Sequence, residues 1–278
     1  MSATAEAYTG PLGELKEGVE HLLKTLDPLS VFGNRFHPTR IASFGEWTLS
    51  INTVYFLISA IVVVWIGFAV AKRMSIVPKG RLMNAFEFLV EFVRNNVANI
   101  IKHDQRKYEP FLLTCFFFIL ISNLIGLIPG VHPGTGIIGG TLALAITVLV
   151  YFNAVGMKAK GGLKYWLGLV PNGVPVWLAP IIWIIEFVSM LLRPITLALR
   201  LFANMYAGHI ILGIFGLLTG LFAEATLIHH SGALIAASPA WLLLLIAMYV
   251  LELVVAFVQA YVFSLLTAVY IDGAVSGH

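Results

Sequence analysis

Charge and cysteine are scarce in this chain of 278 residues. Only 11% of the residues are charged, against about a quarter in soluble domains, whereas 59% are hydrophobic. The one cysteine, Cys115, lies within a long apolar run, so neither an intramolecular disulfide nor a cysteine metal cluster can form. This composition excludes a soluble domain, a disordered chain, a secreted disulfide scaffold and a nucleic-acid-binding protein.

Several functional motifs are missing as well. The sequence contains no Walker A pattern, no nucleophile elbow and no His-Glu-x-x-His zinc motif. We therefore expect no cofactor, no bound metal and no catalytic site of the chain's own. The small basic excess, 17 Lys and Arg against 14 Asp and Glu, is typical of a membrane protein with basic inner loops.

Long apolar runs dominate what is present. About 20 apolar residues suffice to cross a bilayer as a helix, and the sequence predicts five such spans, at 49–71, 111–128, 136–156, 176–222 and 233–271. Segment 78–107 combines charged residues with an apolar stripe at helical spacing, which is typical of an interfacial amphipathic helix. The predicted fold is an all-α membrane protein with a single membrane domain, residues 47–278.

Residues 1–46 are the only stretch of soluble composition. They lack the basic start and the apolar core of a signal peptide. Apolar residues recur at three- or four-residue steps between Leu12 and Leu26. This pattern predicts a short amphipathic helix on a membrane or partner surface, within an extramembrane N-terminal segment.

Basic residues orient the first three spans. Segment 72–107 holds eight Lys or Arg and loop 157–170 holds three, whereas the turn 129–135 holds none. Loops rich in Lys and Arg stay on the inner side of the membrane. We therefore expect the N-terminus outside, both basic segments inside and the turn outside.

The last two apolar segments are too long for upright helices. Either each segment is broken, with Pro180 and Pro194 as candidate kinks, or both segments lie steeply oblique in the bilayer as a hairpin. The absence of a basic inner loop within them favours oblique helices. The outer turn of this hairpin is predicted at 223–232, with Glu224, His229 and His230.

A stripe of polar residues runs along segment 181–208. At 100° per residue, six side chains fall within an arc about 80° wide, namely Glu186, Ser189, Arg193, Thr196, Arg200 and Asn204. Ionisable groups inside a membrane helix are costly, so this face is predicted to meet water or another charged surface. The plainer alternative is a helix interface with scattered polar residues.

Arg200 lies at the centre of the stripe and keeps its charge at any physiological pH. A carboxylic acid that arrives beside it would release its proton, because a nearby cation lowers the pKa of the acid. The chain has no second inward stripe of carboxylates. We therefore infer that a partner supplies the acid.

A second group of ionisable residues lies away from this stripe. His209 is about 180° from Arg200 around the helix and roughly 13.5 Å further along its axis. Glu252 and Gln259, seven residues apart on the last segment, share one face. A histidine opposite a glutamate across the hairpin predicts a proton relay, whereas the alternative is that His209 only hydrogen-bonds a backbone carbonyl.

Three motifs resemble the membrane-embedded a subunit of F-type ATP synthases. They are Leu-Arg-Leu-Phe-Ala-Asn-Met-Tyr-Ala-Gly at 199–208, Gln-Ala-Tyr-Val-Phe at 259–263, and Asn-Leu at 123–124 followed by Leu-Ile-Pro at 127–129. The resemblance covers roughly residues 45–271. It implies an oblique hairpin packed against a rotating ring of c subunits, with peripheral-stalk b subunits and a catalytic head as further partners.

The resemblance also implies roles for matching residues. Arg200 takes the place of the essential arginine between two offset half-channels. Glu186, with Ser189 beside it, takes the place of the glutamate near the inner channel mouth. Asn204 and Gln259 take the places of the arginine's polar neighbours.

This chain departs from the family pattern at two points. Some bacterial members carry a glutamate at the position of His209 and a histidine at that of Glu252, so the two residue types are exchanged here. Gly126 replaces an acidic residue that some members carry. We interpret the exchange as compensation, and secondary candidates for the ion pathway are Arg193, Thr196, Asn123 and Glu224.

The implied function is that of a proton-conducting stator subunit, which couples proton flow to ring rotation and ATP synthesis. The expected location is the bacterial plasma (inner) membrane or, alternatively, an organellar inner membrane. A stand-alone secondary ion antiporter would show internal repeats and broken helices, and no convincing repeat is present. A purely structural membrane scaffold leaves Arg200 unexplained.

Overall fold

The computed structural model describes residues 40–44, 47–73, 81–102, 104–128, 134–168, 170, 175, 177–229 and 232–276. Contacts divide the chain into two compact units. The first unit comprises Met1–Ile51 and Tyr206–Val254, and the second comprises Asn52–Met205 and Val255–His278. The helix predicted between residues 12 and 26 lies outside the described residues.

The described chain is helical apart from one short β-hairpin. Its helices are α3 (Ile51–Arg73), α4 (Arg81–Asn96), η1 (Ala98–Ile100), α5 (Gln105–Gly126), η2 (Gly134–Gly136), α6 (Ile138–Lys160), α7 (Gly162–Leu167), α8 (Ala179–His229) and α9 (Gly232–Ser276). Within the described residues, four helices are long and apolar enough to cross a membrane, and α3 carries a shorter apolar stretch, Thr53–Ala69. The all-α membrane fold is thereby confirmed.

The β-hairpin precedes the first membrane helix. Strands β1 (Arg40–Phe44) and β2 (Trp47–Ser50) pair antiparallel, with Phe44 opposite Trp47. Helix α3 therefore begins at Ile51 instead of the predicted Leu49. A short apolar run beside β-branched and aromatic residues does not reveal by periodicity alone where a strand ends and a helix begins.

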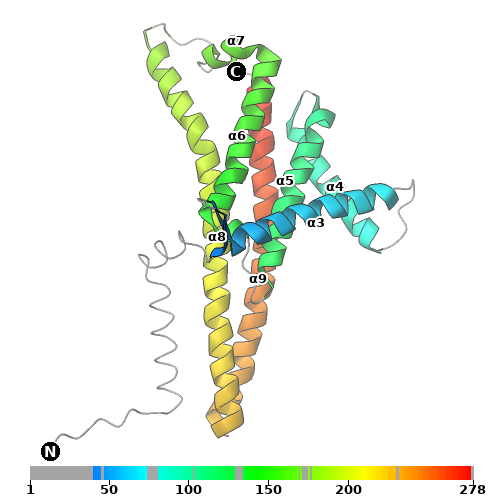
Figure 1. Cartoon of the computed structure of the whole chain (residues 1–278), viewed down its shortest axis with the longest axis vertical. Helices are drawn as coiled ribbons and strands as arrows, with labels where there is room; N and C mark the ends of the chain where they lie inside the picture. The colour runs from blue at the N-terminus through cyan, green and yellow to red at the C-terminus, as the bar shows by residue number, and fades with distance from the viewer. Residues whose placement is uncertain are drawn as a thin grey trace, which may run out of the picture. The chain divides into compact units, whose positions relative to one another are not determined.

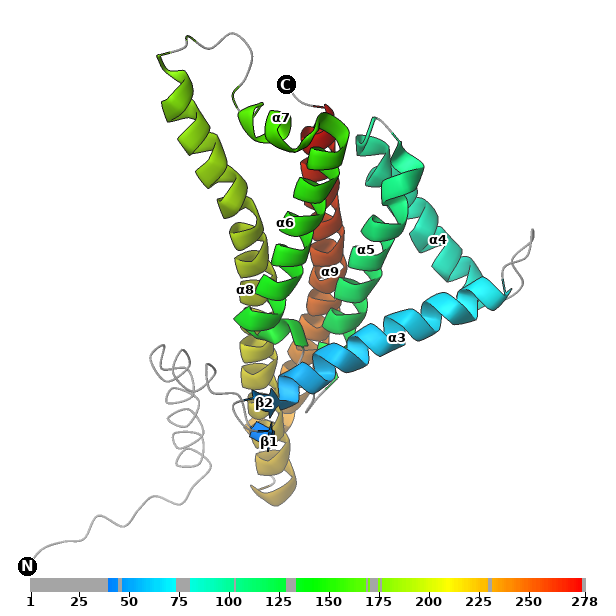
Figure 2. The ribbon, with the colours of Figure 1, turned by 45° about the horizontal axis from the view of Figure 1, so that its top comes forward.

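The second unit is built around helices α5 and α6 and the C-terminal part of α9, which run side by side, while α3 runs across them at a steep angle (Figures 1 and 2). The core contains the fully buried Phe116 of α5 and Phe263 of α9. Phe56 of α3 meets Phe118 of α5 edge-on, with ring centroids 5.0 Å apart. This aromatic contact packs α3 against α5 within the second unit.

The amphipathic helix is shorter than the predicted 78–107. Helix α4 ends at Asn96, and η1, an extended Ile101 and a left-handed Asp104 (φ 53°) lead the chain into α5. The predicted apolar stripe packs on protein, since Val93, Val97 and Ile101 are buried in the core of the second unit. That α4 lies at the membrane surface stays a prediction.

The last two apolar segments each form one helix. Helices α8 and α9 contain 51 and 45 residues, or about 76 and 68 Å of helix at 1.5 Å per residue. Pro194 does not end α8, and Pro180 lies in its first turn, where proline is tolerated. Unbroken helices of this length support the oblique arrangement, because a hydrocarbon core is only about 30 Å thick.

The outer turn predicted at 223–232 is wrong over most of its length. Residues 223–229 continue α8, and α9 begins at Gly232, so Glu224 and His229 belong to a helix, while His230 lies outside the described residues. The sequence from 223 to 229 contains neither glycine nor proline, so nothing in it ends the helix. Within the first unit, the hydroxyl of Thr219 donates to the carbonyl of Trp241 (3.2 Å) and ties α8 to α9.

Candidate functional site

Helix α8 has three distinct faces between Ala179 and Met205. One side exposes eight large apolar side chains, namely Ile181, Ile184, Ile185, Val188, Leu191, Leu192, Ile195 and Leu199. The opposite side is buried, with Leu197, Ala198 and Leu201 at most 1% exposed. At helical spacing, the polar stripe runs along one border between these two faces.

Arg193 and Glu186 form an ion pair within the stripe. Nη2 of Arg193 lies 2.9 Å from Oε1 of Glu186, and the two side chains are 39% and 31% exposed. The guanidinium carbon of Arg193 is 5.8 Å from the ring centroid of Tyr270 on α9. Sequence reasoning missed this ion pair, although two opposite charges seven residues apart lie on the same face of a helix. No sequence pattern pointed to the contact with Tyr270.

Arg193 also lies near the short helix α7. Burial raises the pKa of Tyr165 above its ordinary value, and the positive charge of Arg193 acts against this rise. The hydroxyl of Tyr165 donates to Oδ1 of Asn153 on α6 (3.0 Å). Arg193 therefore lies where α7, α8 and α9 meet, with its charge compensated inside the chain.

Arg200 has a different environment. Its side chain is exposed, and within the described part of the chain it makes no hydrogen bond or ion pair. Thr196, one turn earlier, is also exposed, and its hydroxyl donates to the carbonyl of Arg193 (2.9 Å). The stripe thus contains one arginine whose charge is compensated and one whose charge is available to a partner.

Buried polar atoms without partners accompany the stripe in the second unit. Among the described residues, Nε2 of Gln259, whose side chain is 6% exposed, has no hydrogen-bond partner, and neither has Nδ2 of the half-buried Asn204. The hydroxyls of the fully buried Ser122 and Ser264 likewise find no partner in the part of the chain that the structure describes. An unpaired buried polar group costs about 1–3 kcal/mol, so these positions favour water or a proton-carrying group beside them.

In the first unit, Glu252 of α9 packs against Gly208 of α8. The side chain of Glu252 is 5% exposed, and its Oε1 has no hydrogen-bond partner among the described residues. A Cβ at position 208 would collide with the carboxylate, so the glycine provides the space for it. Gly208 was missed by sequence reasoning, although a glycine inside a helix is unfavourable and signals a close approach.

His209 follows Gly208 directly. Its side chain is half-buried and takes part in an interaction within the chain. Its pairing with Glu252 stays a prediction. Ser189 is half-buried on the stripe. The side chain of Glu224 lies outside the described residues.

Asn123 connects three elements of the second unit. Its Nδ2 donates to the carbonyl of Ala256 on α9 (3.4 Å), and its Oδ1 accepts from the hydroxyl of Thr135 in η2 (3.1 Å). Both side chains are fully buried. This geometry gives Asn123 a structural task at the end of α5, whatever its part in an ion pathway.

Comparison with known proteins identifies the family. A family model described as ATP synthase A chain matches residues 53–272. The chain is 37% identical over 252 residues to the ATP synthase subunit a of Gluconacetobacter diazotrophicus, which covers 91% of this chain and 98% of that protein. It is 43% identical over 208 residues to the ATP synthase subunit a of an Arthrobacter species, with 73% and 76% coverage. These similarities, found along the helices that carry the arginine stripe, show that the chain belongs to the ATP synthase A chain family of membrane-sector subunits.

Proposed function

We propose that this chain is the proton-conducting stator subunit of a rotary ATP synthase, with Arg200 between two offset half-channels and facing a carboxylate of the c-subunit ring. The observation that supports this proposal is the contrast between two arginines on one helix. Arg193 is compensated by Glu186, whereas Arg200 is exposed and without a partner in the described part of the chain.

The surroundings of Arg200 fit an apolar partner that carries a single acid. The exposed apolar face of α8 borders the stripe, so a partner helix that covers this face brings its own side chains close to Arg200. Apolar surroundings raise the pKa of a carboxyl group and keep it neutral, whereas a nearby guanidinium lowers that pKa and favours the ionised form. Each acid of the ring therefore releases its proton at Arg200 and takes one up before it leaves.

Arg200 also keeps the two half-channels apart. A guanidinium stays protonated in proteins and has no acceptor atom, so it cannot relay a proton from one channel to the other. Its fixed positive charge further repels protons that approach directly. Protons then cross only on the ring, which couples their flow to rotation.

For the inner half-channel we assign Glu186 and Ser189 as the outlet. Arg193 holds one oxygen of Glu186 at 2.9 Å, and the carboxylate, 31% exposed, keeps its second oxygen for water or a proton. The role of Arg193 is to position Glu186.

For the outer half-channel we assign Asn204 and Gln259 in the second unit, and Glu252 and His209 in the first. Among the described residues, buried polar atoms without a hydrogen-bond partner occur on Asn204 and Gln259 in the second unit and on Glu252 in the first, and such atoms favour bound water. His209 is the one of these residues whose ordinary pKa lies near neutral pH. We propose the bacterial plasma membrane as the location, with b subunits and the catalytic head as further partners.

The function is tested with the whole complex reconstituted into vesicles. We expect ATP addition to acidify the vesicle interior at the same rate with and without sodium, and a protonophore to abolish the signal. Vesicles that hold this chain alone are the control and should show no ion exchange. Sodium-dependent pumping would contradict the choice of ion, and exchange by the chain alone would identify an antiporter.

The orientation is tested by cysteine labelling. Lys102→Cys lies in the basic inner segment and Ile128→Cys at the start of the outer turn, and both positions are exposed, whereas the native Cys115 is buried and Thr135 is too buried to serve. We expect a membrane-impermeant maleimide to label position 102 only from the inner side and position 128 only from the outer side. Labelling of both from one side would contradict the predicted topology, and the unsubstituted chain gives the background.

A further inference from the structure

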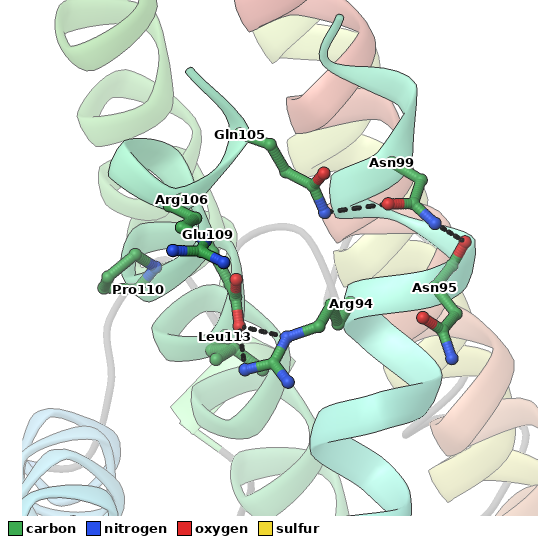
Figure 3. Close-up of a pocket in the computed structure, with 8 residues that line it drawn as sticks. All are labelled: Arg94, Asn95, Asn99, Gln105, Arg106, Glu109, Pro110 and Leu113. Atoms are coloured by element: carbon green, nitrogen blue, oxygen red, sulfur yellow. Dashed lines mark hydrogen bonds and ion pairs between the residues drawn. The ribbon is translucent and has the colours of Figure 1, made fainter. Parts of the chain in front are cut away.

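A second candidate site lies away from the arginine stripe, within the second unit. An open cavity of about 650 Å³ lies between α4, η1 and the first turns of α5 (Figure 3). None of its lining residues belongs to the polar stripe or to the ion pathway proposed above.

One wall of the cavity is a fixed ion pair. Nε and Nη2 of Arg94 lie 2.8 and 2.7 Å from Oε1 of Glu109, which is only 12% exposed. This hydrogen bond and the charge of Glu109 raise the pKa of Arg94 above its ordinary value. The pair is pre-organised, and Arg94, 51% exposed, still turns part of its guanidinium toward solvent.

Further polar side chains line the cavity. Nε2 of Gln105 donates to Oδ1 of Asn99 (2.8 Å), whose own Nδ2 donates to the carbonyl of Asn95 (3.0 Å). Arg106 is exposed and makes no hydrogen bond or ion pair within the described part of the chain. Figure 3 shows its guanidinium on the same side of the cavity as Glu109.

The charge of the lining suits a monoanion. Two arginines and one glutamate leave a net charge of one positive, 2 − 1 = +1, with Arg106 as the unpaired cation. A phosphodiester carries one negative charge, and a guanidinium binds phosphate oxygens through two parallel N–H groups.

The cavity also has an apolar part. Pro110 and Leu113 also line it, immediately before and inside the apolar run of α5. The lining thus changes from charged to apolar along one helix turn, as the membrane does between headgroups and hydrocarbon. The eight basic residues of segment 72–107 predict that this end of α5 lies at the inner leaflet.

We infer that this cavity binds a phospholipid of the inner leaflet, with its phosphate at Arg106 and Arg94 and the start of an acyl chain along Pro110 and Leu113. A free phosphate would satisfy the arginines and leave the apolar part uncovered. An acidic segment of a neighbouring subunit would cover both parts without phosphate. The lipid is the occupant that matches the charge, the apolar lining and the membrane depth together.

The test counts phospholipids retained by the purified complex in native mass spectrometry of its membrane sector. Arg106→Gln removes the unpaired cation, and Lys107→Gln is the matched control, because Lys107 is exposed, one residue away and outside the cavity. We expect Arg106→Gln to lower the occupancy of one retained lipid at least about tenfold, as loss of a charge-assisted hydrogen bond predicts. Lys107→Gln should retain the lipid as the unsubstituted complex does.

Two further arms separate the possible occupants. Millimolar inorganic phosphate during purification should not displace the lipid. If the complex loses the lipid and retains phosphate in its place, the lipid assignment is overturned. Arg106→Cys should not crosslink to a neighbouring subunit, and efficient crosslinking would replace the lipid by a protein segment. Equal lipid retention in the Arg106→Gln and Lys107→Gln complexes would also overturn the inference.

Discussion

Arg200→Ala is expected to lower ATP synthesis by at least about a hundredfold while the complex still assembles. Without the guanidinium, a ring carboxylate in this apolar environment has no counter-charge, and desolvation of an ion costs several kcal/mol, where each 1.36 kcal/mol is a factor of ten in rate. Because Arg200 is exposed and makes no hydrogen bond or ion pair within the described part of the chain, we expect its removal to leave the fold of this subunit intact. Synthesis is measured in inverted vesicles, and assembly by subunit stoichiometry of the purified complex.

The matched control for Arg200 is Arg193→Gln, on the same face of the same helix. Arg193 and Glu186 are both partly exposed, and such pairs contribute about 1 kcal/mol or less, so this change should slow synthesis by no more than about fivefold. Arg200→Lys should fail like Arg200→Ala, because an ammonium that the apolar partner covers can lose its proton. Equal losses at positions 193 and 200, or normal synthesis in Arg200→Ala, would contradict the proposed role.

The second large effect is expected at His209 and Glu252. If the two groups pass one proton between them, His209→Ala and Glu252→Ala should each slow proton uptake, and the double variant should be no worse than the poorer single one. The exchange His209→Glu with Glu252→His should restore part of the rate that each single exchange loses. ATP-driven proton pumping measures all of these, and strictly additive losses without rescue would show two independent residues.

The structure supplies a further control for this pair. Gly208→Ala pushes a methyl group into the carboxylate of Glu252, whereas Gly213→Ala, on the same helix, meets no atom within 4 Å. We expect Gly208→Ala to slow proton uptake as strongly as Glu252→Ala and Gly213→Ala to have little effect. If both glycine variants pump normally, the position of the Glu252 carboxylate does not limit uptake.

Several features of this protein follow from composition and spacing alone. An apolar run of 20 residues has few alternatives to a membrane helix, and a six-residue polar stripe with an 80° arc follows from helix geometry wherever the helix is unbroken. The family motif around Arg200 was also recognisable in the sequence. These features depend on local sequence or on helical periodicity, so they can be predicted without knowing how the helices pack.

Other features depend on contacts between distant segments. The start of α3 and the end of α8 differ from the prediction for a local reason, because apolar periodicity alone does not show where a strand or helix ends. Long-range contacts account for other differences. Asn123 was a candidate for the ion pathway from its motif, and the structure gives it two partners, Thr135 and Ala256. Such partners lie 12 and 133 residues away in the chain, and no pattern of spacing reveals them.

The two arginines of the stripe show most clearly what the sequence determines and what the tertiary structure decides. The sequence was sufficient to place Arg193 and Arg200 on one face of a membrane helix, since that needs only 100° per residue. Which of them keeps a free charge could not be read from spacing, because charge compensation depends on side-chain direction and on what packs nearby. Folding pairs Arg193 with Glu186 and sets it beside Tyr270, and leaves Arg200 at the border of an exposed apolar face. Helical periodicity thus determines where a charge stands, and tertiary packing determines whether that charge remains available to a partner.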